Sequence, residues 1–253
     1  MDAAAHRQDV MPMKVLRPMN QSEKAVYEYL QARGFERVVH EPDGKMPPDF
    51  LLDGRIAVEV RRLNQNEATG LGHRGLEETA KPFDAAFRKI LASLGPSTTG
   101  SSWFVGYTFS RPLPPWKDVE RLLAGGLQKF RCQPSHESCD IRVARDISLR
   151  FVRASDVHPT FFVPGWAADH DEGGFVMAEL EQNLRLCIAQ KTRKVAKVRY
   201  KYPEWWLALE DRIGYGALDE SERRQLSELV QADGDWTKII LVNPLNPATG
   251  FEL

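Results

Sequence analysis

Short stretches with β-strand patterning alternate along this chain with longer segments that have helical periodicity. The strand-like stretches cover 37–40, 49–52, 56–63 and 103–109, a hairpin at 141–145 and 147–153, the run WWLALED, and a last run TKIILVNP. The helix-like segments cover 20–33, 76–94, 117–130, 176–201 and 219–231. Strands interleaved with helices predict an α/β fold, with a mixed β-sheet flanked by helices.

We expect one main domain over residues 20–253, with an insertion around 131–165 and a flexible leader over residues 1–19. The leader lacks the apolar core of a signal peptide. No apolar run approaches the ~20 residues of a membrane span, so a membrane partner is not expected. Three cysteines suit a reducing compartment, which favours a cytoplasmic protein.

The cysteines also offer a weak metal alternative. Cys132, His136 and Cys139 lie close together in sequence, but a structural zinc site needs four ligands and the chain has no CxxC pair to complete one. The histidines show no HxH or HExxH spacing, which disfavours a histidine–metal enzyme.

Charge is balanced overall and uneven locally. The chain has 34 basic and 35 acidic residues, so it is not a strongly basic nucleic-acid coat. Residues 191–201 nevertheless carry six basic side chains and no acid. This run indicates either a nucleic-acid contact or a solvated helix face.

The run PDFLLDGRIAVEVRR carries the most chemistry. A two-residue Asp53-Gly54 turn would place Asp49 on the face opposite Glu59 and mix apolar with polar side chains. A three-residue Leu52-Asp53-Gly54 loop instead pairs Phe50 with Ile56 and sorts the apolar residues onto one face. We therefore predict the second register, with Asp49, Glu59 and Arg61 together on the other face.

Two carboxylates on a largely apolar strand pair are costly unless a cation or donors neutralise them. Diagonal neighbours across such strands lie about 7–8 Å apart, within reach of one cation. Their hard oxygen atoms suit Mg²⁺ or Mn²⁺. The hairpin therefore predicts a divalent-metal site.

A helix carrying an acid, followed by strands with PD…ExR, resembles the PD-(D/E)xK phosphodiesterase superfamily, which has the restriction-endonuclease-like fold. The resemblance covers residues 20–63 and, more loosely, the helix and strand that follow. It implies that Asp49 and Glu59 hold the metal, that Val60 adds its backbone carbonyl, and that the protein cleaves phosphodiester bonds in DNA, or occasionally RNA. It also gives Glu23 a metal role, although a capping box with Asn20 explains this acid equally well.

Arg61 stands where the superfamily has lysine. Arginine can grip a phosphate but cannot act as a general base. Lys191 lies in the middle of an apolar stripe on the 176–201 helix, where a lysine is unusual without an anionic neighbour. Since some members of the superfamily relocate the lysine to a helix, Lys191 is our candidate catalytic cation and Lys194 its substitute. The alternative is that Lys191 extends to solvent.

Residues after the second strand are candidate nucleic-acid contacts, although a solvated loop would explain them too: Arg62, Asn64 and Gln65. Lys194 joins them as a phosphate contact.

The leading hypothesis is thus a Mg²⁺-dependent endonuclease acting on DNA or RNA, with Asp49, Glu59, Arg61 and Lys191 as catalytic residues and a homodimer as a candidate assembly. A second hypothesis is an inactive, nuclease-fold module that binds nucleic acid or protein. A third is a small-molecule hydrolase or structural protein in which the PD…E pair is coincidental.

Overall fold

The computed structural model describes residues 17–70, 72–97, 100–230 and 236–253. The chain forms two compact units. Unit 1 combines Met1–Asn64 with Val176–Leu253, and unit 2 is Gln65–Phe175. The sequence predicted one domain with an insertion only around 131–165. The inserted segment is in fact much longer, because the strand at 103–109 pairs with strands of its own unit.

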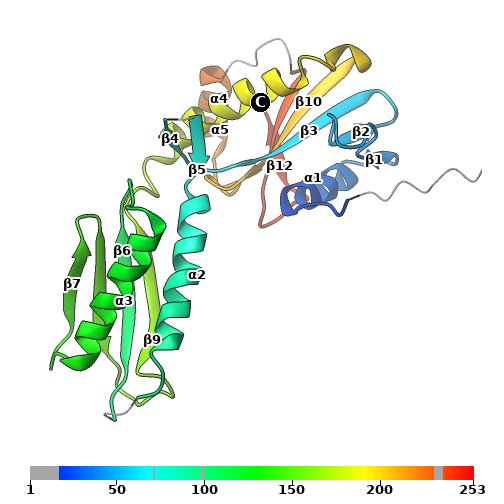
Figure 1. The fold of residues 1–253 in the computed structure, drawn as a ribbon. Coiled ribbons are helices and arrows are strands. Elements are labelled where there is room, and N and C mark those ends of the chain that lie inside the picture. The colour runs from blue at the N-terminus through cyan, green and yellow to red at the C-terminus, as the bar shows by residue number, and fades with distance from the viewer. Residues whose placement is uncertain (1–16, 71, 98–99, 231–235) are drawn as a thin grey trace, which may run out of the picture. The chain divides into compact units, whose positions relative to one another are not determined.

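Unit 1 is built on a six-stranded mixed sheet in the order β1-β2-β3-β10-β11-β12 (Figure 1). Its strands are β1 (Val38–His40), β2 (Phe50–Leu52), β3 (Ile56–Leu63), β10 (Glu204–Asp211), β11 (Lys238–Val242) and β12 (Gly250–Glu252). β3, β10 and β11 run parallel, and the flanking pairs are antiparallel. The predicted α/β class with a mixed sheet is confirmed.

Helices cover both faces of this sheet. α1 (Gln21–Ala32) packs on the face that carries Val58 and Val60. α4 (Val176–Val195) and α5 (Glu220–Leu229) pack on the face that carries Ala57 and Leu63. A short 3₁₀ helix, Arg199–Lys201, follows α4, so the helix predicted over 176–201 ends early. β3 is buried on both faces because it lies at the centre of the sheet.

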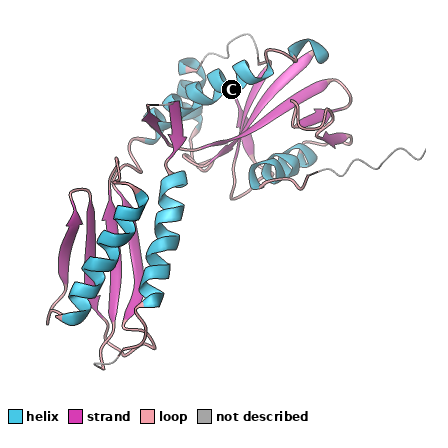
Figure 2. Cartoon of the chain, in the orientation of Figure 1, coloured by secondary structure: helices cyan, strands magenta, loops and turns pink. Residues whose placement is uncertain are grey.

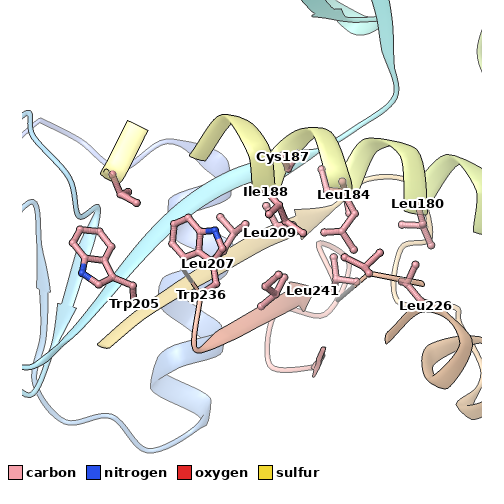
Figure 3. Packing of buried hydrophobic residues seen from close by; sticks show 14 of the residues in the cluster. Leu180, Leu184, Cys187, Ile188, Trp205, Leu207, Leu209, Leu226, Trp236 and Leu241 are labelled. Atoms are coloured by element: carbon pink, nitrogen blue, oxygen red, sulfur yellow. The ribbon is translucent and has the colours of Figure 1, made fainter. Parts of the chain in front are cut away.

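α4 is held by an apolar stripe at helical spacing. Figure 3 shows this stripe lying over strand residues Leu207, Leu209 and Leu241, and its labelled members are Leu180, Leu184, Cys187 and Ile188. All four are buried. The stripe fixes the rotation of the helix about its axis, and so determines which of its polar side chains face β3.

The β2–β3 hairpin has a register that the sequence did not predict. Phe50 pairs with Val58 and Leu52 with Ile56, so the loop is Asp53-Gly54-Arg55. The predicted Leu52-Asp53-Gly54 loop is wrong by one residue, and the pairing by two. Asp53 and Gly54 both adopt positive φ, at 50° and 73°, which moves the turn toward β3. Because a two-residue shift preserves the alternation of faces, the predicted grouping of side chains survives.

Unit 2 has a four-stranded sheet in the order β7-β8-β6-β9 (Figure 2). Its strands are β6 (Trp103–Phe109), β7 (Cys139–Ala144), β8 (Ile147–Arg153) and β9 (Phe162–Asp169). α2 (Glu77–Ser93) and α3 (Trp116–Cys132) pack on one face of it through a core rich in phenylalanine. The hairpin predicted at 141–153 is confirmed.

Four strands were missed. The predicted loop at 64–75 contains a hairpin, β4 (Asn66–Thr69) with β5 (Gly72–Gly75). The predicted loop at 154–175 contains β9, whose run PGWAAD lacks the branched side chains typical of strands. β12 is only three residues long and pairs at the sheet edge. No helix among the described residues is long and apolar enough to cross a membrane.

A buried ion pair ties two strand ends of unit 2 together. Arg111 donates from both terminal nitrogens to the two carboxylate oxygens of Asp169, at 2.7 Å each, and to the carbonyl of Leu76 at 2.8 Å. The Arg111 and Asp169 side chains are only 5% and 4% exposed. Removing one partner would leave the other charge buried and uncompensated.

We therefore predict that Arg111→Ala destabilises unit 2 by about 3–5 kcal/mol. Hydrogen exchange of the β6 and β9 amides measures this loss locally. Arg121→Ala, which breaks an exposed pair with Asp118, is the control and should cost under about 1 kcal/mol. An equally small effect for Arg111→Ala would show that the buried pair is not a stabilising element.

Candidate active site

Asp49 and Glu59 lie together on the α4 side of the sheet. Glu59 is central in β3, and Asp49 immediately precedes β2. Continuing the hairpin register by one pair sets Asp49 directly opposite Glu59. Asp49 Oδ2 also accepts the backbone N–H of Val60 at 2.7 Å, which fixes its carboxylate against β3. The sequence predicted these two acids on one face, and the structure places them there.

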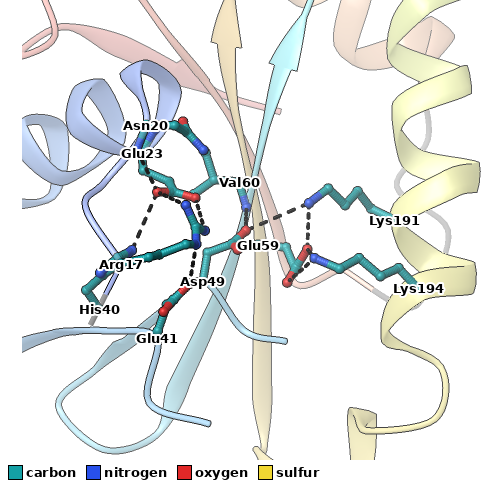
Figure 4. A network of polar contacts seen from close by, with 10 residues as sticks. All are labelled: Arg17, Asn20, Glu23, His40, Glu41, Asp49, Glu59, Val60, Lys191 and Lys194. Carbon is teal, nitrogen blue, oxygen red and sulfur yellow. Dashed lines mark hydrogen bonds and ion pairs between the residues drawn. The ribbon is translucent and has the colours of Figure 1, made fainter. Parts of the chain in front are cut away.

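Two lysines from α4 meet these acids. Lys191 Nζ lies 2.6 Å from Glu59 Oε2 and 3.8 Å from Asp49 Oδ2. Lys194 Nζ lies 2.9 Å and 3.3 Å from the two oxygens of Glu59. Figure 4 shows both amines extending from α4 toward Glu59. Lys191 therefore does not extend to solvent.

The site is partly withdrawn from water. The Glu59 side chain is fully buried, while Asp49 and Lys191 are 15% and 13% exposed. Burial, together with the neighbouring charge of Glu59, raises the pKa of Asp49. Burial disfavours the charged form of Lys194, but the adjacent carboxylate of Glu59 outweighs it and raises the pKa of this lysine. The cluster therefore pairs two acids with two ammonium groups.

Arg61 follows Glu59 on the same face of β3. Its guanidinium donates to the side-chain oxygen of Gln190, which comes from α4. Cys187 is buried nearby, and burial raises its pKa to about 11, so its thiol remains protonated at neutral pH. Arg61 is thus anchored to the helix beside the lysines.

Glu23 belongs to a separate cluster. It closes the predicted capping box with Asn20, and it accepts hydrogen bonds from Arg17. His40 lies 3.5 Å from it, and Arg17 also pairs with Glu41. Burial opposes the charge of Glu23, but the hydrogen bonds from Arg17 lower its pKa. In Figure 4 this cluster lies on one side of β3 and the two lysines on the other.

The predicted leader therefore ends earlier than residue 19, because Arg17 is bound to two acids. Residues 1–16, which make up the rest of the predicted leader, lie outside the described part of the chain.

The candidate nucleic-acid contacts do not lie together in the structure. Arg62 lies on the α1 face, where its Nε is 3.6 Å from the buried Glu210. Gln65 donates to and accepts from the backbone of Gly173, at 2.6 Å and 3.0 Å. Asn64 is half-buried and takes part in a non-covalent interaction. Of the four predicted contacts, only Lys194 joins Asp49 and Glu59.

The donor set has the chemistry that a hard cation requires. Asp49 and Glu59 supply carboxylate oxygens, and Mg²⁺ commonly takes one or two carboxylates with waters and substrate phosphate oxygens. Across the described residues, no group of three or more His, Cys, Asp or Glu side chains is placed to hold a metal. Asp49 and Glu59 are thus two carboxylate donors at this site, and Glu23 is not a third.

Several residues near the site were not identified from sequence. Gln190 could have been found, because it precedes Lys194 by four residues and so lies on the same side of the helix. In the separate Glu23 cluster, Arg17 and His40 contact Glu23, and Glu41 contacts Arg17. These residues carry no spacing signal, because only the fold brings β1 and the segment before α1 together.

Comparisons with protein-family models, curated proteins and solved structures found no match to this chain.

The raised pKa of Asp49 gives a prediction about stability. The folded chain keeps this proton to higher pH than the unfolded chain, so ionisation of Asp49 lowers folding stability as pH rises above the ordinary aspartate range. Asn is neutral, similar in size, and still accepts the Val60 N–H. We expect Asp49→Asn to raise the thermal midpoint at pH 7.

The difference between Asp49→Asn and the parent should shrink as pH falls below the ordinary pKa of aspartate. Asp53→Asn, at the exposed turn, is the matched control, because the same substitution there removes no buried carboxylate. A lower midpoint for Asp49→Asn at pH 7 would mean that the contact between the Asp49 carboxylate and Lys191 outweighs the cost of burial.

Proposed function

We propose that this protein is a divalent-metal-dependent nuclease of the PD-(D/E)xK type, cleaving DNA or RNA. The single observation that carries the proposal is the convergence of three charged groups from distant segments. Lys191 Nζ lies 2.6 Å from Glu59 and 3.8 Å from Asp49, so the α4 lysine that we propose as a substitute for the motif lysine contacts both acids. α1 followed by the β2–β3 hairpin supports the proposed restriction-endonuclease-like fold of unit 1.

Asp49, Glu59 and the carbonyl of Val60 would hold Mg²⁺ or Mn²⁺. Such a metal would lower the pKa of a bound water and polarise the scissile phosphate. The Val60 N–H fixes the Asp49 carboxylate in position for this role. Because Glu59 contacts both lysines, sharing its carboxylate with a metal would weaken part of that contact and leave an amine available for the phosphate.

Lys191 would then stabilise the negative charge that develops on the phosphate during hydrolysis. An amine can also exchange a proton, which the guanidinium of Arg61 cannot do. Arg61, held by Gln190, would grip a phosphate oxygen. In this arrangement the lysine function of the superfamily resides on α4 and the charge at position 61 is retained.

Exposed cations continue from the C-terminal end of α4 into the turn that follows it. Arg193 lies in the last turn of α4, Lys197 lies just after the helix, and both side chains are exposed. These side chains form a basic track, Lys194, Lys197 and Arg193, on which a phosphate backbone can lie.

The test is metal-dependent cleavage. Plasmid DNA, single-stranded DNA and RNA are incubated with the full chain and Mg²⁺, Mn²⁺ or chelator. We expect cleavage that requires the metal, and a loss of about 100-fold or more in rate for Glu59→Gln and for Lys191→Met. Circular dichroism shows whether each variant keeps its fold.

Glu28→Gln and Lys24→Met are the matched controls, since both residues are exposed on α1. They should cleave like the parent. Cleavage that survives Glu59→Gln, or that persists in chelator, would exclude this site as the metal-dependent active site.

An inactive nucleic-acid-binding module is the second candidate. It is favoured by the lysines that already engage both oxygens of Glu59, and by Arg61 in place of the motif lysine. It predicts oligonucleotide binding that needs no metal and produces no cleavage under any of these conditions.

Salt dependence tests the basic track separately. Each cation that binds a phosphate of duplex DNA adds about 0.9 to the slope of log K against log salt. Arg193→Gln with Lys197→Gln should therefore lower the slope by about twice that amount, measured by fluorescence anisotropy in chelator. Arg224→Gln, an exposed cation on α5, should leave the slope unchanged. An unaltered slope in the double variant would show that the track does not contact DNA.

A further inference from the structure

One face of the unit 2 sheet carries polar and aromatic side chains that remain accessible. The opposite face packs on α2 and α3. Alternation along the strands places Phe104, Thr108, Ser148, Arg150 and Val152 on the accessible face, and each is exposed or half-exposed. Figure 2 shows the four strands that form this surface. We call it the open face.

A tryptophan lies flat on the open face because a central strand residue is glycine. A Cβ added at Gly106 would come within 2.4–2.7 Å of three atoms of the Trp166 indole. The backbone of β9 has a register shift here, between the residues that pair with Val105 and Tyr107. Glycine in the interior of a strand lowers the stability of that strand. At position 106 it leaves the space that the Trp166 indole occupies.

The seated indole is still 41% exposed. Phe104 precedes Gly106 by two residues, so its ring lies on the same face about 7 Å farther along the strand. His158 contacts this ring edge-on, with ring centroids 5.4 Å apart. Trp166 and the half-buried Phe104 thus place two aromatic rings on the same face of the sheet.

Cations lie beside the rings. Arg150 pairs across the ladder with Gly106, next to the indole, and Arg142 pairs with Ser148 in the adjoining row. Both arginines are exposed. Asp140 is the acid of this surface; its side chain is 62% exposed, and it lies 3.6 Å from Arg150. The open face therefore combines two rings with an excess of positive charge.

We propose that the open face binds a single-stranded segment of nucleic acid. Bases have flat apolar faces that stack on Trp166 and Phe104, and the backbone phosphates between them meet Arg150 and Arg142. A duplex hides its bases, and so could use only the charges of this surface. The inference rests on the proposed function for its nucleic-acid substrate, and it adds that the substrate has an unpaired segment.

The test is binding of a fluorescein-labelled single-stranded DNA 12-mer to the full chain in chelator, followed by anisotropy. Trp166→Ala should weaken binding about 10-fold or more, the effect of losing one stacked base. Trp166→Phe should restore much of it. Trp116→Ala, at an exposed tryptophan on α3, is the matched control and should bind like the parent.

Two surface variants keep the test valid if Trp166→Ala fails to fold. Arg150→Gln and Arg142→Gln should each lower the slope of log K against log salt by about 0.7 for single-stranded DNA. Unchanged affinity in Trp166→Ala, together with unchanged slopes in both arginine variants, would overturn the inference. A loss of affinity in Trp166→Ala that is as large for duplex DNA as for the single-stranded 12-mer would also overturn it.

The outcomes for the two sites are distinguishable. Glu59→Gln should abolish cleavage and leave the affinity for the 12-mer unchanged. Cleavage by a chain whose affinity and salt slopes are unchanged in the Trp166 and arginine variants would support the nuclease proposal and overturn the open-face proposal. Binding that depends on Trp166 in a chain that never cleaves would support the open face and refute the nuclease.

Discussion

The parallel pairing of β3 with β10 is the constraint on which unit 1 depends. It joins two parts of the chain that are separated in sequence by the whole of unit 2. The two strands form eight residue pairs, from Ile56–Glu204 to Leu63–Asp211. The sheet then has one face for α1 and another for α4, and each helix buries its own apolar stripe. Without this pairing, Asp49 and Glu59 of the β2–β3 hairpin and the lysines of α4 would have no common surface.

Glu59 shows what the pairing makes possible. Its position opposite Leu207 lies inside the sheet, where an isolated carboxylate would be strongly disfavoured. α4 offsets that cost with Lys191 and Lys194, which are three residues apart and so project from the same side of the helix. A hydrophobic residue at 59 would pack there more simply. Two acids and two amines in a half-buried place are therefore weak evidence for stability, and they support the proposed active site.

Local signals in the sequence predicted a good deal of this arrangement. The alternation of Phe50, Val58 and Val60 correctly separated the two faces of the hairpin, because a two-residue error in register does not exchange them. The apolar stripe of α4 singled out Lys191, since a lysine within it needs an anionic neighbour. Asn20, Glu23 and Gly34 marked the limits of α1.

The rest depends on information that local patterns do not hold. Nothing in the run WFVGYTF indicates that this strand belongs to the four-stranded sheet of unit 2, so the length of the insertion was not predicted. The turn at Asp53-Gly54-Arg55 requires positive φ at Asp53, which is not a glycine. Aspartate tolerates this conformation, but an aspartate in the sequence does not predict it. Arg62 and Arg61 alternate to opposite faces of β3, and only the partners Glu210 and Gln190 reveal the difference in their surroundings.

In the proposed nuclease, Arg61 and Lys191 together would keep the positive charges of the superfamily motif although its lysine is absent. From a strand, the side chain at position 61 projects on the same face as Glu59, two residues away along β3. From a helix packed on that face, Lys191 contacts the same carboxylate. Gln190 accepts a hydrogen bond from the guanidinium of Arg61, which ties this arginine to the helix that carries Lys191. Under the proposed function, the helix would therefore supply the amine, and the strand would supply a fixed cation suited to a phosphate oxygen.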